Sequence, residues 1–365
     1  MMKIDIEERV LHFKQPAGTS RGVYTERRLW LVKVSNGENI GYGECAPLLD
    51  LSCDAMEPSI YNKVLRGFCD QLEQTGEIPY EAMRNYPSML FGLETALLAL
   101  NSNLSPLSPV AKLPNCSLLA IASHPLPLLF DTAFSRGEVG IPINGLVWMG
   151  NYEEMLRRME EKLKQGFRCV KLKVGAIDFD EEMDLVKCIR ERFSRHEVEL
   201  RLDANGGFSP DEALYKLELL SQYAIHSIEQ PIKQKQWSLM AELCRESPLP
   251  IALDEELIGI NDPDAKRQML RIIKPRYIVL KPSLHGGMMG CREWIQIAKE
   301  EGIGSWITSA LESNIGLNAI AQFCSDVYGD NITFPQGLGT GQLFTDNIPM
   351  PLEIRGDKLW ISKNS

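Results

Sequence analysis

The sequence lacks the residue patterns of a zinc site or a disulfide framework. Its nine cysteines are dispersed without CxxC pairs, and its five histidines do not cluster. Structural zinc sites need such closely spaced pairs, so we do not expect metal chemistry built on these ligands. An odd, scattered set of cysteines is typical of reduced thiols, and the sequence therefore predicts a cytoplasmic protein.

Long apolar runs and basic stripes are also missing. No apolar run approaches the roughly 20 residues of a membrane span, and the charged, strand-like N-terminus MMKIDIEERV does not resemble a signal peptide. The net charge of −10 comes without a basic stripe, which argues against a nucleic-acid partner. We therefore expect neither a membrane nor a nucleic-acid partner, while a homo-oligomer is left open.

The first hundred residues indicate a mixed α and β domain. Residues 1–50 are rich in strand-forming residues, most clearly at Arg28–Val34, and Gly41–Pro47 is expected to leave the sheet. Residues 55–101 have helical composition, with the strongest helical run at Ser88–Leu100.

Two segments fall outside regular patterns. The stretch 101–118 is rich in Ser, Pro and Asn, which predicts a linker or irregular loop. The tail Pro351–Ile361 is strand-like, and we expect it to pair back with the N-terminal domain.

From residue 141 onward, short β-branched runs alternate with amphipathic stretches. This order favours a parallel (β/α)8 barrel. An open doubly wound sheet is the alternative, but no Gly-rich nucleotide fingerprint follows an early strand. The predicted strands are 141–147, 169–174, 198–203, 225–229, 250–254, 277–281, 303–308 and a final one near 332–336. The predicted helices are 151–165, 178–193, 209–222, 234–246, 262–271, 287–301 and 314–328.

Three acids end consecutive strands of this series. Asp203 and Glu229 are 229−203 = 26 residues apart, and Glu229 and Asp254 are 254−229 = 25 apart. Adjacent strands lie about 4.8 Å apart, so three neighbouring strand ends can converge on one ion. Each acid could instead cap the helix that follows it. Buried like charges are costly without a cation, and oxygen ligands favour Mg2+, with Mn2+ second. Asn205 and Glu255 lie beside these acids as candidate supporting residues, whereas Glu256 could be a surface acid.

Lysines flank the acids in sequence order. Lys171 and Lys173 are two residues apart on one strand, so both side chains face the same way, and we expect them inside the barrel. An amine near a cation and a second amine loses its proton more easily. We assign proton transfer to Lys173, and Lys171 would tune its pKa or neutralise substrate charge. Lys281 ends the sixth strand, across the barrel. A dication with a lysine over an α-carbon suits proton abstraction next to a carboxylate.

These residues resemble the enolase superfamily, specifically its muconate-lactonizing branch. The motifs are KLK at 171–173, DAN at 203–205, EQP at 229–231, DEE at 254–256 and LKP at 280–282. The resemblance implies a modified TIM barrel over residues 135–345. It also implies an α+β capping domain over 1–125, completed by the tail 346–365.

Within this branch, the chain looks most like the o-succinylbenzoate synthases. The resemblance rests on four segments, RLDANGGF, KPSLHGG, SALESNIG and GLGTGQLFTD. It implies a small carboxylate substrate, 2-succinyl-6-hydroxy-2,4-cyclohexadiene-1-carboxylate, which a β-elimination of water converts into 2-succinylbenzoate in menaquinone biosynthesis. The segment Gly18–Gly22 resembles a mobile loop that closes over substrate, but an ordinary hairpin turn explains it equally well. The substrate-binding or supporting candidates that follow from these segments are Arg201, Ser283, Ser309, Glu312, Ser313 and Gly337.

Two related activities remain as alternatives. Dipeptide or N-acylamino acid epimerases share the lysine positions, but they usually carry an Asp-x-Asp pair after the eighth strand, where this chain reads GLGTGQLFTDN. Muconate cycloisomerases share the metal-binding acids, and the motifs separate them less well. A barrel that serves only as a scaffold would have no need of the acids and lysines.

Overall fold

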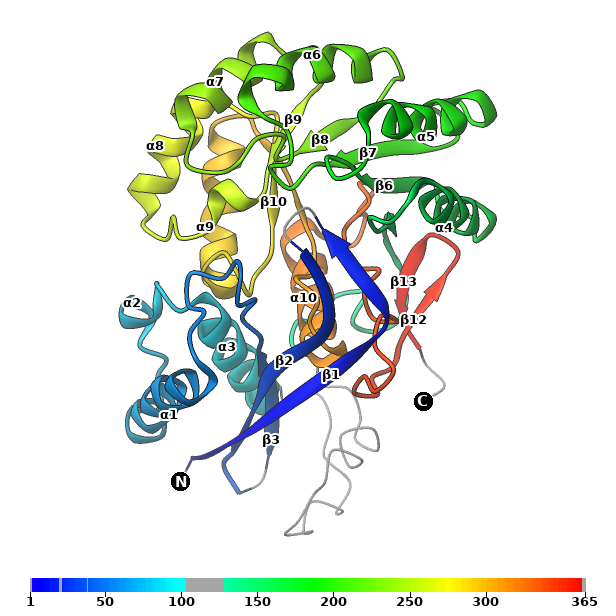
Figure 1. Cartoon of the computed structure of the whole chain (residues 1–365). Helices are drawn as coiled ribbons and strands as arrows, with labels where there is room; N and C mark the ends of the chain where they lie inside the picture. Colours follow the sequence, from blue (N-terminus) through cyan, green and yellow to red (C-terminus); the bar gives the residue numbers. More distant parts are fainter. Residues whose placement is uncertain (1, 20–21, 38, 103–127, 363–365) are drawn as a thin grey trace.

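The computed structural model describes residues 2–19, 22–37, 39–102 and 128–362. Figure 1 shows a barrel-shaped part, built from the green to orange elements, above a smaller part made from the blue N-terminal elements. The predicted linker 101–118 lies almost wholly outside the described residues. The arrangement is a (β/α)-type barrel with an α+β capping domain, which confirms the predicted fold class.

The capping domain is a three-stranded antiparallel sheet packed on helices. Its strands are β1 (Lys3–Thr19), β2 (Gly22–Ser35) and β3 (Ile40–Cys45), and its helices are α1 (Pro58–Thr75), α2 (Tyr80–Met83) and α3 (Pro87–Asn101).

The expectation that Gly41–Pro47 leaves the sheet was wrong, because β3 continues to Cys45. Gly41 and Gly43 instead allow α3 to approach, since a Cβ on Gly43 would overlap the carbonyl oxygen of Gly92.

The barrel sheet places the predicted site strands side by side. Its order is β11-β10-β9-β8-β7-β6-β5, and all its pairs are parallel. The strands are β5 (Gly145–Val147), β6 (Cys169–Lys173), β7 (Glu199–Asp203), β8 (Ser227–Glu229), β9 (Ile251–Leu253), β10 (Tyr277–Leu280) and β11 (Gly304–Ile307). The outer helices are α4 (Tyr152–Lys164), α5 (Phe179–Arg192), α6 (Pro210–Ser221), α7 (Trp237–Glu246), α8 (Pro263–Ile273), α9 (Gly287–Glu300) and α10 (Asn314–Tyr328).

Two predicted strands differ from the structure. The strand predicted near 332–336 is reduced to single parallel bridges, Ile143 with Gln336 and Thr308 with Gly337, which close the ring between β5 and β11. The strand predicted at 141–147 is split into β4 (Ile141–Pro142) and β5. The split follows from pairing, since β4 belongs to another sheet.

The tail pairs with the start of the barrel and not with the capping sheet. Strands β12 (Leu352–Arg355) and β13 (Lys358–Ile361) form a hairpin, and β13 pairs antiparallel with β4. The expected pairing of this segment with the N-terminal domain was therefore wrong. Contact with that domain comes earlier, where Lys14 N donates to the Leu343 carbonyl and Thr345 N donates to the His12 carbonyl.

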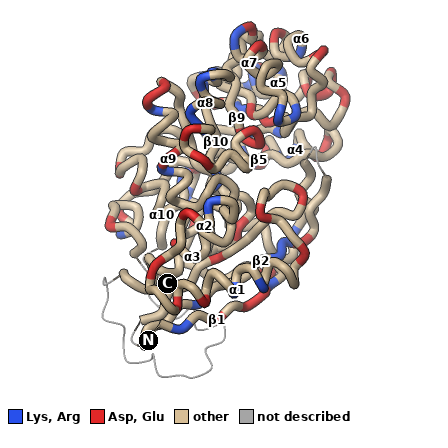
Figure 2. Tube along the Cα trace, turned by 90° about the vertical axis from the view of Figure 1, so that its left-hand side faces the viewer, with Lys and Arg blue, Asp and Glu red and all other residues tan. Residues whose placement is uncertain are grey.

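Local sequence explains the outer helices well. Asn151 and Glu154 form a reciprocal capping box at the start of α4, and Asp262 caps α8 by accepting from Ala265 N. Figure 2 shows acidic and basic residues interspersed along the outer helices α5 to α8. Among the described helices, none has the length and apolar character needed to cross a bilayer.

Two buried carboxylates of the capping domain cap helices of the barrel. Glu94 on α3 accepts hydrogen bonds from the backbone N–H groups of Met288 (2.5 Å) and Met289 (3.0 Å), in the first turn of α9. Glu44 on β3 accepts from Ser313 N (2.8 Å) and Gly316 N (2.9 Å) at the start of α10. Helix N-termini carry unpaired N–H donors and partial positive charge. These contacts therefore fix the capping domain to one side of the barrel.

Replacing Glu94 by Gln should change how stability depends on pH. Burial raises the pKa of Glu94 to about 8, from an ordinary value of 4.5, despite its two N–H donors. The native state thus holds an extra proton between these values, so Glu94 makes stability fall as pH rises through this window. We expect the free energy of unfolding of the wild type to fall relative to Glu94→Gln by about 1–3 kcal/mol between pH 5 and 9, measured by urea unfolding. Replacing the exposed Glu77 by Gln is the control, and parallel curves for Glu94→Gln and wild type would contradict this expectation.

Candidate active site

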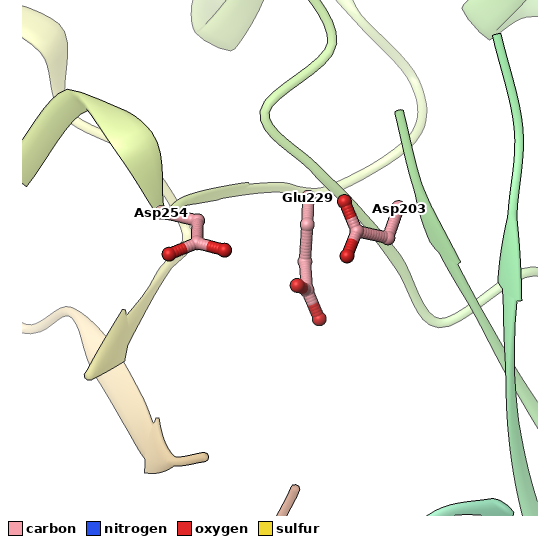
Figure 3. Close-up of side chains that lie close together, drawn as sticks. All are labelled: Asp203, Glu229 and Asp254. Atoms are coloured by element: carbon pink, nitrogen blue, oxygen red, sulfur yellow. The ribbon is translucent and has the colours of Figure 1, made fainter. Parts of the chain in front are cut away.

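The three predicted metal-binding acids meet at the C-terminal end of the barrel strands. Asp203 and Glu229 are partners in register on β7 and β8, and Asp254 directly follows β9. One carboxylate oxygen from each lies within 4.8 Å of the others, and all three side chains are buried. Figure 3 shows the three carboxylates turned toward a common space. Because successive side chains of a strand alternate, Leu202 and Ile228 pack outward while the acids point inward.

The donor set fits a divalent cation. Oε1 of Glu229 is buried and has no hydrogen-bond partner among the described residues. Burial, together with the neighbouring Asp203 and Asp254, raises the pKa of Glu229 to about 7. A buried cluster of this kind is costly unless positive charge neutralises it. An oxygen-only set of ligands suits a hard cation, so these residues could bind a metal ion.

The two lysines of β6 have different surroundings. Lys171 Nζ lies 2.9 Å from Glu229 Oε2 and 3.2 Å from Asp203 Oδ2. Lys173 Nζ lies 2.8 Å from Asp203 Oδ2 and donates to Asn205 Oδ1 at 2.6 Å. Burial lowers the pKa of both amines, but at Lys171 the charges of Glu229 and Asp203 outweigh it and raise its pKa. At Lys173 burial prevails, helped by the charge of Lys171, and its pKa is lowered. Lys173 is thus the better proton acceptor.

Lys281 faces β6 across the acids. It directly follows β10, and the three strands that carry the acids lie between β6 and β10 in the sheet. Its Nζ lies 2.5 Å from Asp254 Oδ2 and 2.8 Å from Asp254 Oδ1. Burial would lower the pKa of Lys281, but the charges of Asp254 and Glu255 raise it. Lys281 is therefore held as an ammonium ion opposite Lys173.

Side chains next to the acids hold them in place. Asn205 links the lysine side to the acid side, because its Nδ2 donates to Glu255 Oε1 at 2.9 Å. Gln230, which the sequence analysis did not single out, accepts from the backbone N–H groups of Asp254 (3.3 Å) and Glu256 (3.2 Å). Its backbone is left-handed, with φ at 39°, a strained conformation for such a residue that often marks a functional site.

The sequence analysis left open that Glu256 is a surface acid, and the structure shows that it is not. It is buried, and it accepts from Lys235 N at 2.7 Å and Gln230 Nε2 at 3.1 Å. Burial raises its pKa. Glu256 therefore braces the loop that carries Asp254.

The predicted substrate-binding residues divide into two groups. Ser309 and Gly337 line the cavity above the acids, together with the three lysines. Ser283 and Ser309 both donate to the buried carboxylate of Glu312, whereas Ser313 donates to Glu44. Ser283, Glu312 and Ser313 thus support the wall from behind.

Arg201 lies deeper than the sequence analysis placed it. It is fully buried, its guanidinium carbon lies 4.6 Å from the Trp306 ring centre and 4.3 Å from that of Phe334, and Nε donates to Glu199. Arg201 shares the inward face of β7 with Asp203, but two residues earlier, and a strand rises about 3.3 Å per residue. It fills the barrel interior below the acids and does not line the cavity.

Both domains form the cavity wall. The barrel supplies Asn144, Leu146 and Trp148 around β5, which the sequence analysis did not identify. The capping domain supplies Thr19, Tyr24, Leu48 and Leu51. Thr19 and Gly22 are partners at the tip of the β1–β2 hairpin, and Gly18 forms a bridge with Met149 of the barrel. Positions 20 and 21 of the predicted loop lie outside the described residues.

Two family models match the chain. The model described as enolase C-terminal domain-like covers residues 154–358, and the model described as MenC, N-terminal domain, covers residues 19–100. A curated relative, the o-succinylbenzoate synthase of Desulfotalea psychrophila, is 44% identical over 371 residues, which cover 99% of this chain and 99% of the relative. The chain belongs to the o-succinylbenzoate synthase family. Its predicted place in the enolase superfamily and its class as a lyase are confirmed.

Solved structures show how widely this fold is shared. The crystal structure of MenC from Desulfotalea psychrophila LSv54 has a TM-score of 0.77 and 38% identity, with 99% of each chain covered. The dipeptide epimerase from Enterococcus faecalis V583, complexed with Mg and the dipeptide L-Leu-L-Tyr, has a TM-score of 0.79 at 18% identity, with 99% of this chain and 96% of that chain covered. The second likeness concerns the fold alone. Backbone similarity therefore does not separate o-succinylbenzoate synthases from epimerases, and the family assignment rests on the full-length relative that is 44% identical.

Removing one acid of the cluster should weaken metal binding. We expect Glu229→Gln to reduce the affinity for Mg2+ by about tenfold or more, because a charged oxygen ligand is lost. Isothermal titration calorimetry measures this directly. Glu94→Gln is the control, since that side chain is also buried but caps α9 and contacts none of the three acids. An unchanged Mg2+ affinity in Glu229→Gln would remove Glu229 from the metal site.

Proposed function

We propose that this chain is an Mg2+-dependent o-succinylbenzoate synthase. The reaction is the loss of water from 2-succinyl-6-hydroxy-2,4-cyclohexadiene-1-carboxylate, which gives 2-succinylbenzoate. One observation carries the proposed chemistry: Lys173 and Lys281 lie on opposite sides of three converging carboxylates, and both lysines line one cavity together with Asp203. The family relationship to a relative named o-succinylbenzoate synthase supports the choice of substrate.

Asp203, Glu229 and Asp254 would hold the cation. When bound, Mg2+ supplies positive charge that stabilises the developing negative charge on the substrate carboxylate. Lys171 remains an ammonium ion beside Glu229 and Asp203, so it holds these two ligands in place and keeps positive charge close to the same carboxylate. The oxygen-only donor set suits hard divalent cations, Mg2+ first and Mn2+ second.

Lys173 would act first as base and then as acid. Its neutral amine takes the proton from the ring carbon that bears the carboxylate, and the electron pair of that C–H bond passes into the carboxylate. The pair then returns to form the new ring double bond while the C–O bond to the neighbouring hydroxyl breaks. Lys173 gives its proton to the departing oxygen, and water leaves. A depressed pKa suits an amine that must accept a proton near neutral pH.

Lys281 would stabilise the intermediate from the other face of the ring. It stays charged because Asp254 and Glu255 raise its pKa. An ammonium ion over a planar, electron-rich ring gains a cation–π contribution. Asn205 would keep Lys173 directed at its target, since it accepts from the amine and is itself anchored to Glu255.

Replacing Lys173 by Ala should abolish turnover and spare the metal site. We expect the rate of dehydration to fall by about 10³-fold or more, because the neighbouring amine, Lys171, is kept protonated by Glu229 and Asp203. The increase in ultraviolet absorbance of the aromatic product measures the rate, and titration calorimetry checks that Mg2+ still binds. Lys216→Ala, on the outer helix α6, should behave like wild type. Substantial residual dehydration in Lys173→Ala would exclude Lys173 as the base.

The same assay separates the epimerase alternative. An epimerase would exchange the α-hydrogen of N-acylamino acids or dipeptides for deuterium in D2O without dehydrating the cyclohexadiene. If wild-type protein shows that pattern, the proposed substrate is wrong, even if Lys173 is the base.

A further inference from the structure

Arg27 joins the two domains directly behind the cavity wall. It lies on β2, only 3% of its surface is exposed, and its guanidinium donates to backbone carbonyls of both domains. In the capping domain the acceptors are the carbonyls of Ala46 and Pro47. In the barrel they are the carbonyls of Leu311 (3.2 Å) and Ala310 (3.3 Å). One side chain thus bonds the loop after β3 to the loop after β11.

Both of these loops carry cavity-lining residues. Leu48 and Leu51 follow the first pair of acceptors, while Ala310 and Leu311 are themselves the second pair, and all four line the cavity. Leu48 and Ala310 also belong to one small buried cluster with Leu284, which lies three residues after Lys281. Apolar contacts therefore bring the two loops together, and Arg27 fixes their register.

The barrel loop makes hydrogen bonds of its own, such as Leu311 N to Ser309 Oγ at 3.0 Å, but it contains one strained turn. Leu311 has a left-handed backbone with φ at 66°, which is strained for a residue with a branched side chain. Glu312 accepts from Ser309 Oγ and Ala310 N, both at 2.6 Å, within the same loop. The bonds from Arg27 to Ala310 and Leu311 therefore hold this strained turn from the capping side.

The bonding pattern argues for positioning over simple charge pairing. A planar guanidinium offers five N–H donors in a fixed fork, which suits four acceptors on two loops better than the three donors of a freely rotating lysine ammonium. Burial lowers the pKa of Arg27, and the charges of Glu312 and Glu44 offset part of this effect. The guanidinium of Arg27 contacts backbone carbonyls directly. The directions of its N–H donors, and not an ion pair, therefore fix the positions of the two loops.

We infer that Arg27 is a positioning residue for substrate binding, which locks the loop 46–51 of the capping domain to the loop 308–312 of the barrel as one wall of the active-site cavity. The inference rests on the proposed function for its kinetic consequence, but the locking itself does not depend on the identity of the substrate. Arg27 acts through the wall and does not touch the reacting atoms.

The experiment compares Arg27→Met with Arg84→Met. Arg84 also links the domains, since it donates to the carbonyl of Asn261 and to Glu293, but none of these residues lines the cavity. We expect Arg27→Met to raise KM about tenfold with kcat changed much less, because wall contacts serve ground state and transition state alike. Arg84→Met should leave KM near the wild-type value, and Mg2+ affinity should be unchanged in both variants.

Hydrogen exchange provides a readout that needs no substrate. In Arg27→Met, amides of both 46–51 and 308–312 should exchange faster, whereas Arg84→Met should leave them protected. Arg27→Lys keeps the positive charge but loses the planar guanidinium. We expect its KM to lie between those of the wild type and Arg27→Met, and its loop amides to exchange faster than in the wild type. This variant serves as the test if Arg27→Met does not fold. Unchanged protection in the Arg27 variants, or an equal rise of KM in Arg84→Met, would overturn the inference. If the wild-type protein has no dehydration activity, the proposed function is wrong, but the hydrogen-exchange test of Arg27 remains valid.

Discussion

The structure depends on the electrostatic balance among three buried carboxylates and three lysines. Asp203, Glu229 and Asp254 would repel one another strongly in a site closed to water. Each of these acids touches at least one lysine amine within 3.2 Å. The effect on the lysines is unequal, because the acids raise the pKa of Lys171 and Lys281, whereas burial prevails at Lys173 and lowers its pKa. One cluster thereby favours the charged form at two of its lysines and makes the third lysine the easiest to deprotonate.

The barrel creates this inequality through the register of its strands. Lys173, Asp203 and Glu229 are successive partners across β6, β7 and β8, so they lie in one row around the ring. Lys171 is the preceding inward-facing residue of β6, two residues before Lys173, and its amine contacts the same acids. It contacts two of them, whereas Lys173, in the row itself, contacts only Asp203 among the three. A difference of two residues along one strand is thus enough to give identical side chains different proton affinities.

Much of this could be predicted from the sequence because the information is local. Strand and helix periods located β6 to β11 within one or two residues, and the spacing of the acids predicted their convergence. The errors arose where distant segments decide the outcome. β4 separates from β5 because β13, more than 200 residues later, pairs with it. Arg201 points into the barrel as Asp203 does, and the sequence did not show that the rings of Trp306 and Phe334, from later in the chain, enclose its guanidinium below the acids. Arg27 carries no motif at all, because its acceptors are backbone carbonyls that any residue could supply.

The two domains contribute different parts of the candidate site. The acids and lysines stand on short parallel strands of the barrel, a rigid support that fixes charge positions. The capping domain contributes to the cavity wall instead, through Leu48 and Leu51, and it is fixed by carboxylates on helix termini and by Arg27 on carbonyls. These docking bonds engage backbone groups of the barrel, which remain when barrel side chains change. The wall can therefore vary in shape without loss of the docking geometry, while the row of acids and lysines cannot. This separation gives a physical reason why epimerases and o-succinylbenzoate synthases share one backbone at low sequence identity.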